Sequence, residues 1–107
     1  MQLKSNNSLG DSDIRAGIHV NFVYPDKKNV RIAYKGLLAK SGASEVYLHA
    51  GIGDNWRNVC DHRMETTQAG FEKTIPVAGD KLNFCFKDSA NNFDNNSGQN
   101  WFLNISR

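Results

Sequence analysis

Apolar residues recur at every second position through most of the chain. The first such run covers residues 18–24 and ends at Pro25-Asp26. This alternation is the period of a half-buried β-strand, and it returns at 30–34, 46–50, 71–77, 82–86 and 101–105, and less regularly at 56–64. No segment has a sustained helical period, and residues 37–43 are long enough for one helical turn at most. About seven short strands predict an all-β, immunoglobulin-like β-sandwich of antiparallel strands, with a five-stranded barrel as the alternative.

The chain has 107 residues, which suffices for one domain with a modest core. Residues 1–15 are rich in Asn, Ser, Gly and Asp, and this composition predicts a flexible N-terminal tail or linker. The remaining residues, 16–107, are predicted to form a single binding module. The N-terminus lacks an apolar stretch of signal-peptide length. We therefore expect a cytoplasmic location for the chain as written, or an extracellular one if the domain was excised from a secreted protein.

Charge and cysteine content exclude several classes of site. The 13 basic and 11 acidic residues are interspersed and give a net charge of +2, so the electrostatic signature of a phosphate binder is weak. No apolar run approaches the length needed to cross a bilayer. Cys60 and Cys85 form no metal-binding motif, and two reduced, mostly buried thiols are favoured over a disulfide between them. We expect no cofactor and no metal.

The segment VYLHAGIGDNW, residues 46–56, groups one imidazole with two aromatic rings. Strand alternation puts its apolar residues on the core face and Tyr47 and His49 on the solvent face. The two glycines of the following loop allow the backbone to bend and bring Trp56 close to this pair. Such a group could clamp the face of a sugar. The alternative is that Tyr47 and His49 are ordinary sheet-surface residues and that Trp56 caps the core.

The segment FDNNSGQNW, residues 93–101, places Phe93 in a long loop that is rich in side-chain amides. Neutral amides donate and accept hydrogen bonds, whereas a ring offers apolar faces. Together they suit a pyranose, which is polar at its rim and apolar on its faces. Ordinary turn chemistry is the favoured interpretation for Asp94. A calcium loop is disfavoured because the glycine falls one place late and no distal glutamate follows.

These two segments resemble the starch-binding modules of carbohydrate-binding families 25 and 53, over residues 17–105. Those families are non-catalytic β-sandwich modules that bind α-1,4-glucans such as starch and glycogen. The resemblance implies a sugar platform of His49, Trp56 and Phe93, with amides from Asn95 and Asn96. Phe93 stands where family 25 more often has tryptophan, which implies weaker stacking at this position. Trp101 matches an aromatic residue that opens the last strand and is interpreted as core.

The predicted function is non-catalytic binding of α-1,4-glucans, including starch, glycogen and maltooligosaccharides. The contacts would be aromatic stacking and hydrogen bonds from amides and the imidazole, with Tyr47 beside His49. No nucleophile elbow or metal triad is present, and no carboxylate pair in an aromatic cleft is evident. The alternative is a single-stranded nucleic-acid-binding β domain, because exposed rings also stack on bases. The expected partner is an α-glucan rather than nucleic acid or a membrane, and a tethered or cooperating amylolytic or glycogen-metabolising enzyme is a further expected partner.

Overall fold

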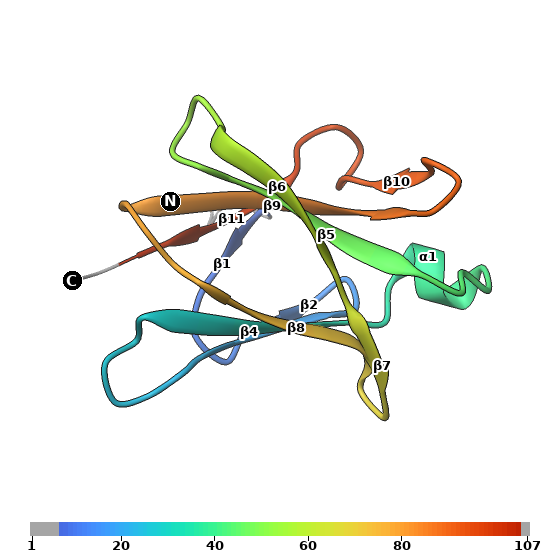
Figure 1. Ribbon diagram of the computed structural model, residues 1–107, viewed down its shortest axis with the longest axis horizontal. Helices are drawn as coiled ribbons and strands as arrows, with labels where there is room; N and C mark the ends of the chain where they lie inside the picture. The colour runs from blue at the N-terminus through green and yellow to red at the C-terminus, as the bar shows by residue number, and fades with distance from the viewer. Residues whose placement is uncertain (1–6, 106–107) are drawn as a thin grey trace, which may run out of the picture.

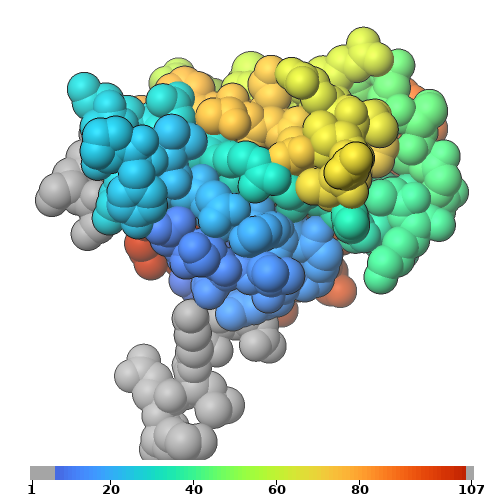
Figure 2. All heavy atoms as spheres, turned by 90° about the horizontal axis from the view of Figure 1, so that it is seen from below, coloured from blue at the N-terminus to red at the C-terminus, as the bar shows by residue number. Residues whose placement is uncertain are grey.

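The computed structural model describes residues 7–105, which form two β-sheets packed face to face (Figure 1). The first sheet has the strand order β1-β11-β9-β5-β6, and β10 also pairs with β9. Its strands are β1 (Ser8–Leu9), β5 (Val46–Ile52), β6 (Arg57–Arg63), β9 (Lys81–Asp88), β10 (Phe93–Asp94) and β11 (Trp101–Asn104). The second sheet has the order β2-β3-β4-β8-β7. Its strands are β2 (Ile14–Arg15), β3 (Ile18–Phe22), β4 (Asn29–Tyr34), β7 (Glu65–Thr67) and β8 (Gly70–Pro76). Figure 2, seen from below, shows the outer face of this second sheet.

Alternating side chains from both sheets fill the space between them. Each fully buried aliphatic or aromatic side chain stabilises the fold by about 1.5–3 kcal/mol relative to an exposed one. Trp101 is 2% exposed and belongs to this core, as predicted. The other core members on the longest strands are Ile18, Val20, Val30, Ile32, Val46, Leu48, Ala50, Leu82, Phe84, Phe86 and Leu103.

The predicted all-β sandwich is confirmed, and each predicted strand segment contains a strand. The predicted helical turn is α1 (Leu37–Lys40). The sequence pattern missed four strands of two or three residues, which are too short to show alternation: β1, β2, β7 and β10. One of these departs from the antiparallel expectation, because β1 pairs with β11 in parallel. The immunoglobulin-like strand order stays a prediction.

The N-terminal segment contributes to both sheets. Residues 8–15 were expected to lie in a flexible tail, but Ser8–Leu9 and Ile14–Arg15 form β1 and β2. Leu9 is buried in the core between the sheets and anchors this segment. The polar composition of the surrounding residues gave no sign of this single apolar contact. The structured module therefore begins before residue 16. Residues 1–6 lie outside the described residues.

The two cysteines lie in different environments, and both are free thiols. Cys85 is buried, as predicted, and this burial is the main cause that raises its pKa to about 11. The prediction was wrong for Cys60, which is exposed. The reason is that β6 is the edge strand of the first sheet and most of its residues face water. Within residues 7–105, no helix has the length and apolar character required to cross a membrane.

Candidate functional site

Strand β5 presents His49 on the outer face of the first sheet. Its even-numbered residues Val46, Leu48 and Ala50 are buried between the sheets, so Tyr47 and His49 point outward. The neighbouring strands place Cys85 of β9 and Asp61 of β6 directly beside His49. The imidazole is half-buried, with 28% of its side-chain surface exposed. The predicted division of this strand into a core face and a solvent face is therefore present.

Trp56 lies over the outer face next to His49. The chain turns after β5, and the Trp56 amide donates to the carbonyl of Gly53 at 3.1 Å. A Cβ atom at Gly51 would lie only 2.8 Å from Cε3 of Trp56, so the indole rests against a strand position that has no side chain. The ring centroids of His49 and Trp56 are 5.8 Å apart, and their planes differ by 33°. Trp56 is half-buried here rather than a core residue.

Phe93 reaches the same surface from a distant part of the chain. In β10, Phe93 pairs with Lys87 and Asp94 pairs with Phe86 of β9. Because successive side chains of a strand point to opposite faces, Phe93 points outward and Asp94 points inward. Phe93 is 46% exposed, and its ring centroid lies 6.1 Å from that of His49 with an interplanar angle of 86°. His49, Trp56 and Phe93 thus form one exposed group, which we call the ring platform.

A buried tyrosine holds β10 in place. The hydroxyl of Tyr34 donates to Oδ2 of Asp94 at 2.6 Å and accepts the backbone N–H of Leu38 at 3.0 Å. The Tyr34 ring is fully buried and stacks on Phe86 with centroids 4.0 Å apart. Burial and the bond to Asp94 raise the pKa of Tyr34 far above its usual value, so the hydroxyl remains a donor. Asp94, expected to act in a local turn, instead fixes the strand that carries Phe93.

The two amides predicted to bind sugar are half-buried in the loop that follows Phe93. Oδ1 of Asn95 accepts the N–H of Gly98 at 3.0 Å. Nδ2 of Asn96 donates to the carbonyl of Asn100 at 3.1 Å, and Asn96 adopts a left-handed backbone with φ 57°. Each amide therefore uses one polar atom to hold the loop and has a second polar atom that could contact a ligand.

The candidate calcium loop does not converge on a common point. The side-chain amide of Asn92 donates to Asp88 at 3.0 Å, whereas Asp94 binds Tyr34 inside the sandwich. Among residues 7–105 there is no cluster of three or more histidine, cysteine or acidic side chains with metal-binding geometry. These side chains support the turn and the adjoining strand.

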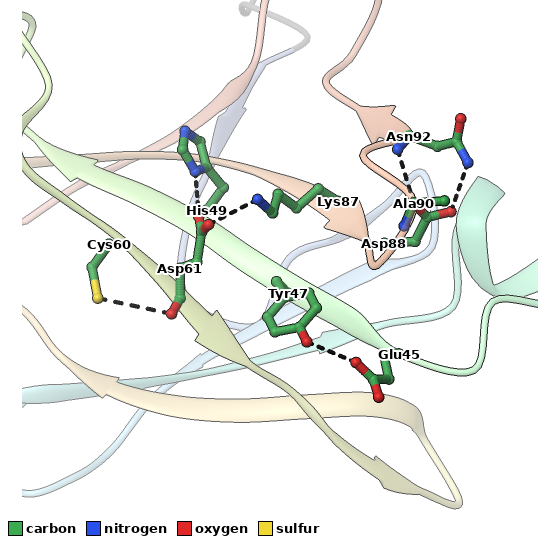
Figure 3. Close-up of polar contacts among 9 residues, drawn as sticks. All are labelled: Glu45, Tyr47, His49, Cys60, Asp61, Lys87, Asp88, Ala90 and Asn92. Atoms are coloured by element: carbon green, nitrogen blue, oxygen red, sulfur yellow. Dashed lines mark hydrogen bonds and ion pairs between the residues drawn. The ribbon is translucent and has the colours of Figure 1, made fainter.

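Asp61 connects His49 to Lys87 on the outer face, as Figure 3 shows. Its Oδ1 lies 2.5 Å from Nδ1 of His49, and its Oδ2 lies 2.9 Å from Nζ of Lys87. Partial burial raises the pKa of Asp61, but hydrogen bonds from His49 and Lys87 outweigh this effect and hold it below the usual 3.8. The anionic carboxylate orients the imidazole, and the other ring nitrogen lies on the side away from Asp61 (Figure 3).

Tyr47 lies two residues before His49 on the same face of β5. Its hydroxyl donates to Oε1 of Glu45 at 2.7 Å, which fixes the direction of the ring (Figure 3). Beside it is a surface hollow of about 220 Å³, which we call the flanking hollow. The residues that line the flanking hollow are Tyr47, Asp61, Lys87, Asp88, Ser89 and Asn91.

We expect Gly51→Ala to weaken ligand binding more than it weakens the fold. The added methyl group would lie 2.8 Å from Cε3 and 3.1 Å from Cα of Trp56, so the indole must shift away from His49. A matched Gly10→Ala variant adds a methyl group at a position without positive φ, where the nearest atom, Oδ2 of Asp13, lies at an ordinary contact distance of 3.6 Å. Fluorescence of Trp56 and affinity electrophoresis in starch gels measure the effect. Unchanged fluorescence and binding for Gly51→Ala would show that Gly51 does not place the indole.

Comparison with known families places these features in context. A family model for the starch/carbohydrate-binding module (family 53) matches residues 30–84, just over half of the chain. The matched segment contains Tyr47, His49 and Trp56, whereas Phe93 and the loop amides lie beyond it. No curated protein and no solved structure shows a significant match to the chain. The matching family consists of non-catalytic modules that bind starch-type carbohydrate. With more than half of its length matched, the chain belongs to carbohydrate-binding module family 53.

Proposed function

We propose that the protein binds α-1,4-glucans through the ring platform and does not cleave them. The observation that carries this proposal is the position of the His49 ring, 5.8 Å from Trp56 and 6.1 Å from Phe93 on a solvent-facing surface. Aromatic side chains offer large, rigid apolar faces at low conformational cost. The apolar faces of glucose units would be buried against these rings.

The angles between the rings favour a curved ligand. The His49 plane is tilted by 33° from Trp56 and by 86° from Phe93, so the three rings do not form one flat surface. A flat polysaccharide ribbon contacts coplanar rings well, whereas an α-1,4-glucan follows a helical curve. The geometry therefore supports starch, glycogen and maltooligosaccharides as ligands in preference to cellulose-like chains.

Polar groups around the rings are suited to sugar hydroxyls. The imidazole is oriented by Asp61 through Nδ1, which leaves its second nitrogen to interact with a hydroxyl group. In the loop that follows Phe93, Nδ2 of Asn95 and Oδ1 of Asn96 would provide a donor and an acceptor. Each such hydrogen bond contributes about 1 kcal/mol net. Imidazole and amide contacts would thus set the orientation of the glucan on the rings.

The carboxylates around the platform support binding without hydrolysis. A glycosidase needs one carboxyl group that stays protonated and acts as a general acid, which requires a raised pKa. The pKa values of Asp61 and Asp88 are lowered instead. Partial burial raises the pKa of Asp61, but hydrogen bonds from His49 and Lys87 outweigh it. Hydrogen bonds, mainly from Asn92, lower the pKa of Asp88. Both groups are therefore suited to accept hydrogen bonds from hydroxyls and not to protonate a leaving group.

Two or three rings imply modest affinity for a single site. Apolar contact and a few hydrogen bonds, less the cost of ordering the glucan, leave a Kd of roughly tens to hundreds of micromolar. Tight attachment to a polymer then requires several sites or a tandem arrangement, because linked sites raise the effective concentration. A tethered or cooperating amylolytic or glycogen-metabolising enzyme is the partner we propose.

Native electrophoresis tests this function. We expect the wild-type protein to be retarded in gels cast with soluble starch or glycogen, but not in gels with a soluble cellulose derivative. A mobility-shift titration with oligo-dT over a salt series tests the nucleic-acid alternative, and we expect no shift because Asp61 neutralises Lys87 beside the platform. Normal migration in starch and glycogen gels would refute the proposed function, and a salt-sensitive shift with oligo-dT would favour the alternative.

Phe93→Trp is expected to strengthen binding severalfold. Phe93 is 46% exposed, so a larger ring has room at this position and covers more of a glucose face. Tyr24→Trp serves as the control, because Tyr24 is also exposed but lies next to the second sheet. Retardation in starch gels of graded concentration gives the affinity of each variant. Equal affinity of wild type and Phe93→Trp would show that Phe93 does not stack on the sugar.

A further inference from the structure

We propose that the flanking hollow binds one further neutral glucosyl unit of the glucan that lies on the ring platform. This inference rests on the proposed function and extends it to the length of glucan recognised. The hollow has a volume of about 220 Å³ and is lined by residues of β5, β6, β9 and the turn after β9. It is therefore built in part by β5, the strand that carries His49, and by the two strands that pair with β5.

The flanking hollow adjoins the ring platform through two shared neighbours, Asp61 and Lys87. Asp61 lines the hollow and also contacts His49, and Lys87 lines it and lies 5.9 Å from the centre of the Phe93 ring. Tyr47 and His49 are two residues apart on one strand, a separation of about 7 Å along the sheet. A glucan that leaves the His49 and Phe93 rings in this direction would enter the hollow next.

The walls of the hollow are held in place before any ligand arrives. Oδ1 of Asp88 accepts the N–H groups of Ala90 and Asn92, both at 2.9 Å, which fixes the turn on one side (Figure 3). The Tyr47 ring on the other side is fixed by its bond to Glu45. A site that is already ordered loses less entropy on binding. Rigid walls of this kind favour a fit to one sugar unit.

The lining has the chemistry of a site for a neutral polyol. The hydroxyl of Ser89 and the amide of Asn91 belong to exposed residues, and both groups donate and accept hydrogen bonds. The charged groups of the lining are Asp61, Asp88 and Lys87, with Lys87 paired to Asp61. The remaining carboxylate repels anions, so a phosphorylated sugar unit would be excluded.

The test is a Ser89→Leu variant, whose larger side chain fills the flanking hollow. Isothermal titration with maltose through maltoheptaose compares it with the wild type and with a Ser41→Leu control, which places leucine at an exposed position beside α1. We expect affinity for the shortest oligosaccharides to be unchanged. For longer ones, which reach the hollow, affinity should fall by about five- to tenfold in Ser89→Leu only.

Amide chemical shifts of the wild type provide a second measurement that needs no variant. Signals of Ser89 and Asn91 should move with longer oligosaccharides and stay fixed with the shortest ones that bind. The hollow would be overturned as a sugar site if Ser89→Leu lost the same affinity at all lengths. It would also be overturned if Ser89→Leu lost none and the Ser89 and Asn91 signals stayed fixed. Either result would leave the proposed binding at the ring platform unaffected. An absence of wild-type binding at every length would overturn the proposed function and the hollow with it.

Discussion

Trp56→Ala is expected to abolish retardation in starch gels and to leave the protein folded. The indole is the largest ring of the platform, and the truncation of such an anchor typically costs about 2 kcal/mol or more of binding energy. A loss of this size moves a Kd of tens to hundreds of micromolar into the millimolar range. Because Trp56 is half-buried on the outer face and lies outside the core, we expect the free energy of unfolding to fall by about 1 kcal/mol.

Tyr24→Ala is the matched control for the loss of Trp56. It removes another exposed ring, which follows β3 of the second sheet, whereas the platform lies on the first sheet. We expect normal retardation for this variant. If Trp56→Ala were retarded as strongly as the wild type, the indole would not be part of the glucan-binding site. Unfolding of Trp56→Ala in urea at a much lower concentration would instead show that the indole stabilises the sandwich.

Tyr34→Phe is expected to destabilise the protein by about 2–3 kcal/mol and to weaken glucan binding severalfold. The Phe ring preserves the stacking on Phe86 but removes the partner of Asp94 and of the buried Leu38 N–H. A buried polar group without a hydrogen-bond partner destabilises the folded state by its full desolvation free energy. Asp94 would then move toward water, and Phe93 beside it would lose its fixed position. Urea denaturation and starch-gel retardation measure the two effects.

Tyr24→Phe is the control for the same chemical change at the surface. The Tyr24 hydroxyl also donates to an aspartate, Asp11, but both groups are exposed. We expect little change in stability and none in binding. If Tyr34→Phe behaves like Tyr24→Phe, then Asp94 does not need its buried partner and β10 is held by its pairing with β9 alone.

The features of the site that follow from alternation along a single strand, or from local composition, could be predicted from the sequence. The apolar positions 46, 48 and 50 require His49 to face outward whichever strands lie beside β5. A ring surrounded by polar loop residues, such as Phe93, needs a partner or a ligand to cover it. Both inferences depend only on local sequence and agree with the positions found in the structure.

The remaining features depend on register between strands that are distant in sequence. Asp61 lies beside His49 because β5 and β6 pair in one particular register. Gly51 admits the Trp56 ring only because the chain folds back over that position. The link from Tyr34 to Asp94 spans sixty positions and both sheets. Exposure of Cys60 likewise follows from the edge position of β6, which no local pattern specifies.

The most direct measurement of the central claim is a chemical-shift titration of the wild-type protein with maltooligosaccharides. We expect saturable shifts of the Trp56 indole N–H, the His49 imidazole and the Phe93 ring, with matching Kd values in the micromolar range. The outer face of the second sheet, where Ile14 and His19 line a separate hollow, should be unaffected. Shifts confined to that second face, or no shifts at all, would contradict the account.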